Sequence, residues 1–244
     1  TMALGASAFF ALGPEMQLRA IAAPMLIAAI GVVLSVLSIF TVRTREGAGM
    51  AQLLKSMSVG TNLAAVLSAA ASFGVLALVF GTETADWWHF SLSVVSGLLA
   101  GVVIGKGTEY YTSHSYKPTQ KLAEAAQTGP ATVIINGVGL GMLSTALPVI
   151  AIVCAIVLAY LCAIGFDVKG MMDAANLSKG LYGVAIAAVG MLSTLGITLA
   201  TDAYGPIADN AGGNAQMSEL EPQVRERTDV LDALGNTTAA TGKG

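Results

Sequence analysis

The chain has 244 residues, of which 55% are hydrophobic and only 11% are charged. Soluble domains carry about 25% charged residues, so the long apolar blocks are expected to be membrane spans rather than core helices. The formal net charge is −3 and the chain has no basic arm, which excludes nucleic acid as an expected partner. We therefore predict an all-α, polytopic transmembrane helix bundle in contact with membrane lipid.

Five long apolar segments are expected to be helices that cross the membrane. A core of about 30 Å needs roughly 20 helical residues, and each segment is at least that long. Together with a helix tail at 1–13 and a cytoplasmic site segment at 220–244, they are expected to form a single transmembrane domain over residues 1–244. The predicted spans are about 20–42, 50–81, 86–112, 130–164 and 179–219.

The basic residues predict how these spans are oriented. Cytoplasmic loops of membrane proteins carry an excess of Lys and Arg. If the five spans alternate in direction, nine of the twelve basic residues fall on one side, which predicts that residues 220–244 are cytoplasmic. The nine are Arg43, Arg45, Lys55, Lys106, Lys117, Lys121, Arg225, Arg227 and Lys243.

The last apolar segment continues into the polar stretch TDAYGPIADNAGGNAQMSELEP. Asp202 and Asp209 are seven residues apart, so on a helix they lie within about 20° of one another. Carboxylates are costly inside a membrane and usually mark a site or an aqueous end. Two stacked carboxylates with Asn210 nearby suit hard cations such as Mg²⁺. Residues 220–229 that follow are typical of a solvated, mixed-charge link.

A second polar cluster lies in DVLDALGNTTAATGKG. Asp232, Asn236, Ala239 and Lys243 fall within roughly 60° of one another on a helix. A lysine can bind a phosphate oxygen directly, whereas a carboxylate needs a metal between itself and a phosphate. Acids with one lysine therefore predict a metal-phosphate ligand.

Two runs of sequence contain glycines at suggestive spacing. TTAATGK ends in Gly-Lys, but a phosphate-binding P-loop needs Gly where Thr237 stands, Ser or Thr where Gly244 stands and a preceding strand, so we reject it. The run from Asn136 to Gly141 alternates glycine with larger residues. Small residues let helices approach closely, so this run predicts tight packing, with a role in an ion pathway as the alternative.

These motifs carry a family resemblance. TEYYTSHSYKPTQKLAEAAQTGPATVIINGVGLGM and TDAYGPIADNAGGNAQMSELEPQVRERTDVLDALGNTTAATGKG resemble the membrane-bound, ion-pumping pyrophosphatases. The resemblance implies a homodimer whose subunit has sixteen transmembrane helices, hydrolyses magnesium pyrophosphate and pumps H⁺ or Na⁺ outward. It implies an integral protein of the plasma membrane, and we expect a prokaryotic source. The chain would be an internal fragment, running from the end of helix seven into helix thirteen.

The resemblance also implies roles for particular residues. Asp209 and Lys243 would be catalytic, and Asp209, Asn236 and Lys243 would bind the substrate, with Asp209 and Asn236 as metal ligands. Asp202 and Asp232 would be polar supports of the same site. Ala239 and Gly242 stand where the potassium-independent branch carries Lys and Thr. The sequence therefore resembles the potassium-dependent branch, with K⁺ beside Mg²⁺ as a cofactor.

The aspartate-rich helices that hold most of the Mg²⁺ in that family do not match any part of this chain, so we expect the chain alone to be inactive. Two other functions are compatible with the polar residues. A secondary transporter would use Asp202 and Asp209 to bind a coupling ion without hydrolysis. A non-catalytic membrane scaffold would merely expose them to water. Neither explains the spacing of acid, amide and lysine.

Overall fold

The computed structural model describes residues 13–243. The expected helix tail at 1–13 lies outside these residues except for Gly13. The predicted all-α class is confirmed, and the described residues contain five helical stretches long and apolar enough to cross a membrane. These stretches are Pro14–Ile39, Met50–Phe80, Asp86–Ala126, Pro130–Ala163 and Ala174–Met217. That they form one transmembrane domain stays a prediction.

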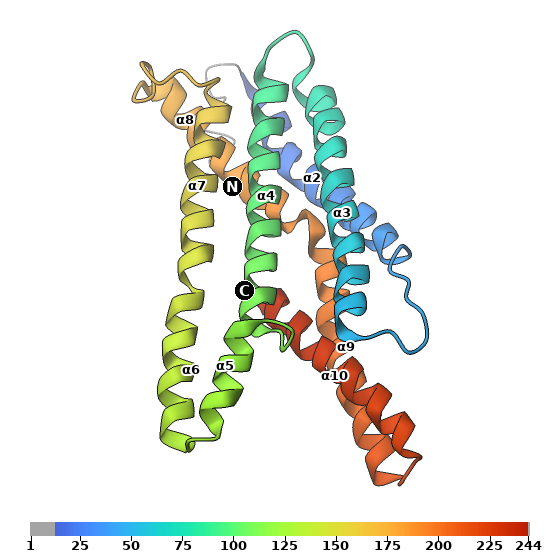
Figure 1. The fold of residues 1–244 in the computed structure, drawn as a ribbon. Coiled ribbons are helices and arrows are strands. Elements are labelled where there is room, and N and C mark those ends of the chain that lie inside the picture. The colour runs from blue at the N-terminus through green and yellow to red at the C-terminus, as the bar shows by residue number, and fades with distance from the viewer. Residues whose placement is uncertain (1–12, 244) are drawn as a thin grey trace. The chain divides into compact units, whose positions relative to one another are not determined.

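Several of these stretches are built from more than one helix. The elements, coloured along the chain in Figure 1, are α2 (Pro14–Ile39), α3 (Met50–Phe80), α4 (Asp86–Thr112), α5 (Lys117–Ala126), α6 (Pro130–Ser144), α7 (Ala146–Ala163), α8 (Ala174–Met191), the 3₁₀ turn η2 (Leu192–Thr194), α9 (Leu195–Met217) and α10 (Pro222–Lys243).

Two predicted spans are interrupted, one at a proline and one at a contact with a distant helix. The span at 130–164 divides after Ser144, because Pro148 has no N–H to give the Ser144 carbonyl and its ring crowds that carbonyl. The span at 179–219 divides at η2, where the Ser35 hydroxyl of α2 donates to the Thr194 carbonyl over 3.1 Å. A side chain that bonds into the helical ladder in this way disturbs the regular helix.

The chain folds as two compact units. Unit 1 contains the described residues up to Ile39, together with Thr61–Val102 and Ala151–Gly196. Its core holds three aromatic side chains, Phe80, Phe90 and Tyr182, with ring centroids 4.9 to 6.3 Å apart. The fully buried Tyr182 hydroxyl donates to the Ala20 carbonyl over 2.9 Å, so this polar atom is satisfied inside the apolar core.

Small residues bring the helices of unit 1 together. A side chain on Gly97 of α4 would collide with the Ala187 backbone of α8, and one on Gly190 of α8 would lie 2.7 Å from the Val94 carbonyl. Ser93 of α4 donates to the Ala159 carbonyl over 2.8 Å. Close backbone approach and hydrogen bonds between helices are typical of helix packing in membranes.

Unit 2 contains Phe40–Gly60, Val103–Ile150 and Ile197–Gly244. It includes two helical hairpins, α5–α6 and α9–α10, whose helices run side by side in Figure 1. Its small apolar cluster joins Met50, Leu53 and Leu54 of α3 to Leu234 of α10. The nine basic residues predicted to share one membrane side all belong to this unit, while Arg19, Lys169 and Lys179 belong to unit 1.

Candidate functional site

The predicted site residues lie on the α9–α10 hairpin of unit 2. The two helices cross at a pair of glycines, because a Cβ on Gly235 would lie only 2.6 Å from the Gly205 Cα. On α9 the buried residues Gly205, Ala208, Gly212 and Ala215 recur at helical spacing, which forms a narrow stripe of small side chains facing α10. The stripe allows the two backbones to approach each other closely.

Arg225 holds the two helices together near the turn that joins α9 to α10. Its Nη1 donates to the Gly212 carbonyl over 2.7 Å and to Gln216 Oε1 over 3.0 Å, and its Nε pairs with Asp229 over 2.7 Å. Residues 220–229 were predicted to be a solvated, mixed-charge link; most of them are exposed, but from Pro222 onward they form the first part of α10 rather than a link. Proline at the first position of a helix is a known start signal and could have identified this helix.

Asp202 lies beside the C-terminal end of α10. The site of a Cβ on Gly242 is 3.5 Å from the Asp202 Cβ, and Thr238 of α10 donates to the Thr201 carbonyl over 3.2 Å. Pro206 follows four residues after Asp202 and has no N–H, so the Asp202 carbonyl does not receive the usual helical hydrogen bond. This segment of α9 therefore presents the half-buried Asp202 side chain beside Gly242.

Asp209 lies on the same side of α9 as Asp202 but is exposed. Because α9 is helical from Leu195 to Met217, seven residues separate the two carboxylates by roughly 10 Å along its axis. Mg²⁺–oxygen bonds are about 2.1 Å long, so one ion cannot bind both groups. Asn210, expected to assist them, donates from Nδ2 to the Pro206 carbonyl over 2.7 Å. Its amide nitrogen is thus bonded within its own helix.

The second predicted face lies on α10. The Asn236 amide nitrogen donates to Asp232 Oδ2 over 3.3 Å, so the amide oxygen of Asn236 is available as a ligand. Ala239 is half-buried and follows Asn236 by three residues, which places it on the same face of the helix. Lys243 is the last residue of α10, and its side chain lies outside the described part of the structure.

The donor atoms fit magnesium in kind but not in number. Carboxylate and amide oxygens are the hard ligands that Mg²⁺ takes. Within residues 13–243, however, no group of three His, Cys, Asp or Glu side chains could hold a metal ion. The described carboxylates of the hairpin therefore cannot complete a cation site by themselves. The Gly-rich run is also less packed than expected, with open space around Gly139 and Gly141 among the described neighbours.

The fold and this hairpin define a polytopic membrane protein that presents carboxylates and amides on a pair of closely packed helices. The family comparison agrees with that class and identifies its family. The model of the inorganic H⁺ pyrophosphatase family matches residues 1–244. The chain belongs to this family, which confirms the resemblance seen in its motifs.

Curated relatives of the chain carry the names of ion pumps. It is 61% identical over 245 residues to a Bacteroides thetaiotaomicron protein whose name is that of a putative K⁺-stimulated pyrophosphate-energized sodium pump, covering 100% of this chain and 32% of that protein. A K⁺-stimulated pyrophosphate-energized sodium pump from Thermotoga maritima is 40% identical, and the match covers 91% of this chain and 29% of that protein. A K⁺-insensitive pyrophosphate-energized proton pump from Methanosarcina mazei is 39% identical, and the match covers 93% of this chain and 31% of that protein. The chain spans about a third of the length of these relatives.

Proposed function

We propose that the complete protein containing this chain hydrolyses magnesium pyrophosphate to phosphate and couples the reaction to outward transport of H⁺ or Na⁺. The observation that carries this proposal is the α9–α10 hairpin, which presents Asp202, Asp209, Asp232 and Asn236 in a chain of the pyrophosphatase family. The names of the similar proteins as pyrophosphate-energized pumps support it.

The proposed roles of the side chains follow from their chemistry. Asp209 and the Asn236 amide oxygen would hold Mg²⁺ together with ligands from outside residues 13–243. Bound Mg²⁺ would supply charge neutralisation for the phosphoryl oxygens. Lys243 would bind an oxygen of pyrophosphate or of the leaving phosphate, which favours direct attack by water. Asp232 would orient Asn236 through the hydrogen bond between them, and Asp202 would support the C-terminal end of α10.

The proposed K⁺ requirement rests on Ala239 and Gly242. Neither side chain carries charge, so neither can replace a bound K⁺. The positions are suitable for such a replacement, because Ala239 shares a helix face with Asn236 and Gly242 lies against Asp202. The name of the Bacteroides protein, a putative K⁺-stimulated pump that is 61% identical to this chain, supports this branch.

Replacing Ala239 tests the K⁺ proposal. Ala239→Lys places an ammonium group one turn from Asn236, where it can substitute for the potassium charge. Phosphate release by the complete protein should then lose most of its dependence on added K⁺, while Ala239→Met, of similar length and no charge, should keep it. An unchanged K⁺ dependence of the lysine variant would contradict the assignment.

We further propose that the subunit works as a homodimer in a prokaryotic plasma membrane, with the hairpin on the cytoplasmic side. The collection of nine basic residues in unit 2 supports this orientation, because cytoplasmic segments near membrane spans are enriched in Lys and Arg.

The direct test of the function is reconstitution of the complete protein in vesicles. Adding pyrophosphate with Mg²⁺ and K⁺ should release phosphate and create an H⁺ or Na⁺ gradient. An uncoupling ionophore should abolish the gradient but leave phosphate release intact. Ion uptake driven by another gradient, without consumption of pyrophosphate, would instead identify a secondary transporter.

A further inference from the structure

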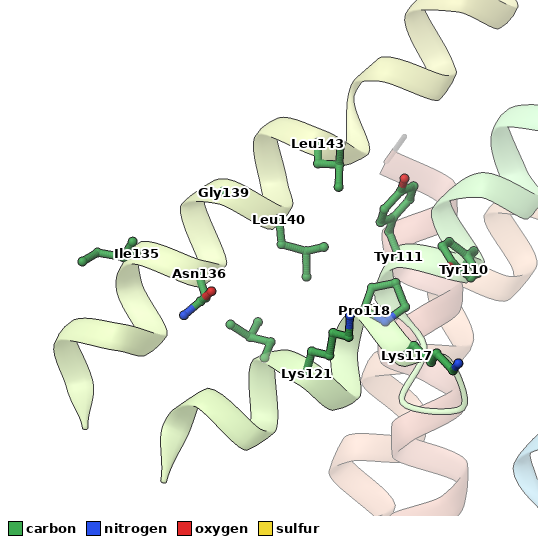
Figure 2. A pocket seen from close by; sticks show the side chains of 11 residues that line it. Tyr110, Tyr111, Lys117, Pro118, Lys121, Ile135, Asn136, Gly139, Leu140 and Leu143 are labelled. Carbon is green, nitrogen blue, oxygen red and sulfur yellow. The ribbon is translucent and has the colours of Figure 1, made fainter. Parts of the chain in front are cut away.

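A separate pocket in unit 2 is lined by none of the residues of the α9–α10 hairpin that carries the candidate site. It has a volume of about 610 Å³ and is bounded by the end of α4, by α5 and by α6. Figure 2 shows Leu140 of α6 and Lys121 of α5 pointing into the space between these helices, with Tyr111 where α4 ends. Lys117 lies at the rim. This volume lies in the range of small-molecule binding pockets.

Local hydrogen bonds hold the walls of this pocket in place. The Thr119 hydroxyl donates to the Tyr111 carbonyl over 3.3 Å, and the Tyr116 hydroxyl donates to Glu109 over 3.0 Å. These bonds join α5 to the end of α4. At the other end, Gly129 turns the chain from α5 into α6 with φ of 128°, a conformation that favours glycine. The pocket is therefore bounded by a fixed corner and a tight turn.

The charge in the pocket is entirely positive. Lys117 and Lys121 are four residues apart and so share one face of α5. Neither forms an ion pair with the described residues, and no Asp or Glu is among the side chains that line the pocket. Figure 2 shows Lys121 directed into the pocket and the Lys117 ammonium directed away from it at the rim, so rotation of the flexible Lys117 side chain is needed to bring both charges to one anion. The polar part of the pocket is thus complementary to a phosphate group.

The other wall is apolar and open. Ile135 and Leu143 of α6 are 71% and 60% exposed, and Gly139 between them leaves room on the same helix. Tyr110 and Tyr111 also line the pocket, and their rings pack edge to face with centroids 5.1 Å apart. Tyrosine and lysine at the end of an apolar helix are typical of the membrane interface. A soluble anion would use the lysines but leave the apolar wall without a partner.

We propose that this pocket binds an anionic phospholipid from the membrane leaflet nearest α5. The phosphate group binds Lys117 and Lys121, the tyrosines contact the glycerol region, and an acyl chain lies along Leu140 and Leu143. Basic pockets between membrane helices bind acidic lipid headgroups by the same chemistry. The proposal does not depend on catalysis, because the pocket shares no lining residue with the predicted substrate site.

Native mass spectrometry of the complete protein with added phosphatidylglycerol or phosphatidylcholine tests the proposal. The wild-type protein should retain phosphatidylglycerol in preference to phosphatidylcholine. Replacing both lysines, Lys117→Gln with Lys121→Gln, should weaken phosphatidylglycerol binding about 30-fold. The matched control replaces two exposed basic residues of unit 2 outside the pocket, Arg43→Gln with Lys55→Gln, and should leave binding unchanged. Equal loss in both double variants would show general surface attraction and overturn the proposal.

A second variant keeps the charges and fills the space. Leu140→Trp should also reduce phosphatidylglycerol binding, since an indole occupies the acyl part of the pocket. Retained binding would overturn the pocket assignment even if the lysine variant failed to fold. Binding of inorganic phosphate that competes with the lipid and is unaffected by Leu140→Trp would overturn it as well, by assigning the lysines to a soluble anion. If the wild type binds neither lipid, another part of the protein covers this surface, and the proposal fails.

Discussion

The two units hold their helices together in different ways. Unit 1 packs Phe80, Phe90 and Tyr182 into a buried aromatic core, and the hydroxyls of Ser93 and Tyr182 donate to carbonyls of neighbouring helices. Unit 2 has only a small apolar cluster around Leu54 and Leu234, and its candidate site residue Asp209 is exposed. Unit 1 is therefore the more extensively packed of the two in its described residues, whereas unit 2 leaves polar side chains of its helices exposed.

The largest effect on stability is expected from Gly97 in unit 1. Gly97→Ala places a methyl group against the Ala187 backbone, which neither helix can avoid without moving. Overpacking of this kind costs about 1–3 kcal/mol, so thermal unfolding in detergent should shift to lower temperature. The matched control is Gly74→Ala in α3, where a Cβ would have nothing within 4 Å. Similar melting temperatures for both variants would show that the α4–α8 contact is not tight.

A glycine-to-alanine substitution at Gly235, in the α9–α10 hairpin of unit 2, should affect activity more than stability. Gly235→Ala pushes α10 away from Gly205, which displaces Asp232 and Asn236 relative to α9. Misplacement of binding groups by about 1 Å can cost about 100-fold in rate, so we expect phosphate release by the complete protein to fall by about 10- to 100-fold. Gly213→Ala, in open space on α9, is the control. Full activity of the Gly235 variant would contradict the proposed role of this crossing.

The smallest effect is expected at the exposed ion pair of unit 2. Arg227 Nη1 and Glu46 Oε1 are 2.8 Å apart, but their side chains are 59% and 82% exposed. Exposed pairs contribute about 0–1 kcal/mol, so Arg227→Gln should barely change the melting temperature at ordinary salt. A shift as large as that of Gly97→Ala would mean that the pair is buried in the complete protein.

The helical class could be predicted from the sequence because long apolar segments have few alternatives in a membrane. Pro148 was also a local signal for the break after Ser144, although a continuous span was predicted there. The break at η2 could not be predicted, because it depends on Ser35, a residue more than 150 positions away from Thr194. The sequence around Thr194 does not indicate which distant helix supplies such a contact.

The site was predicted only in outline. Helical spacing indicated that Asp232 and Asn236 share a face, and the hydrogen bond between them agrees with that arrangement. The close approach of Gly205 and Gly235 could not be predicted, because it depends on how two helices pair in space. The metal ligands cannot be assembled from residues 13–243, so the roles of Asp209 and Asn236 stay predictions.

The central claim is that the exposed face of the α9–α10 hairpin takes part in pyrophosphate hydrolysis. The most direct test compares phosphate release by the complete protein and by two variants that each remove one carboxylate charge from this hairpin. Asp209→Asn should abolish release, whereas Glu226→Gln, an exposed acid of α10 outside the predicted face, should keep the rate of the wild type. Wild-type turnover in the Asp209→Asn protein would contradict the claim.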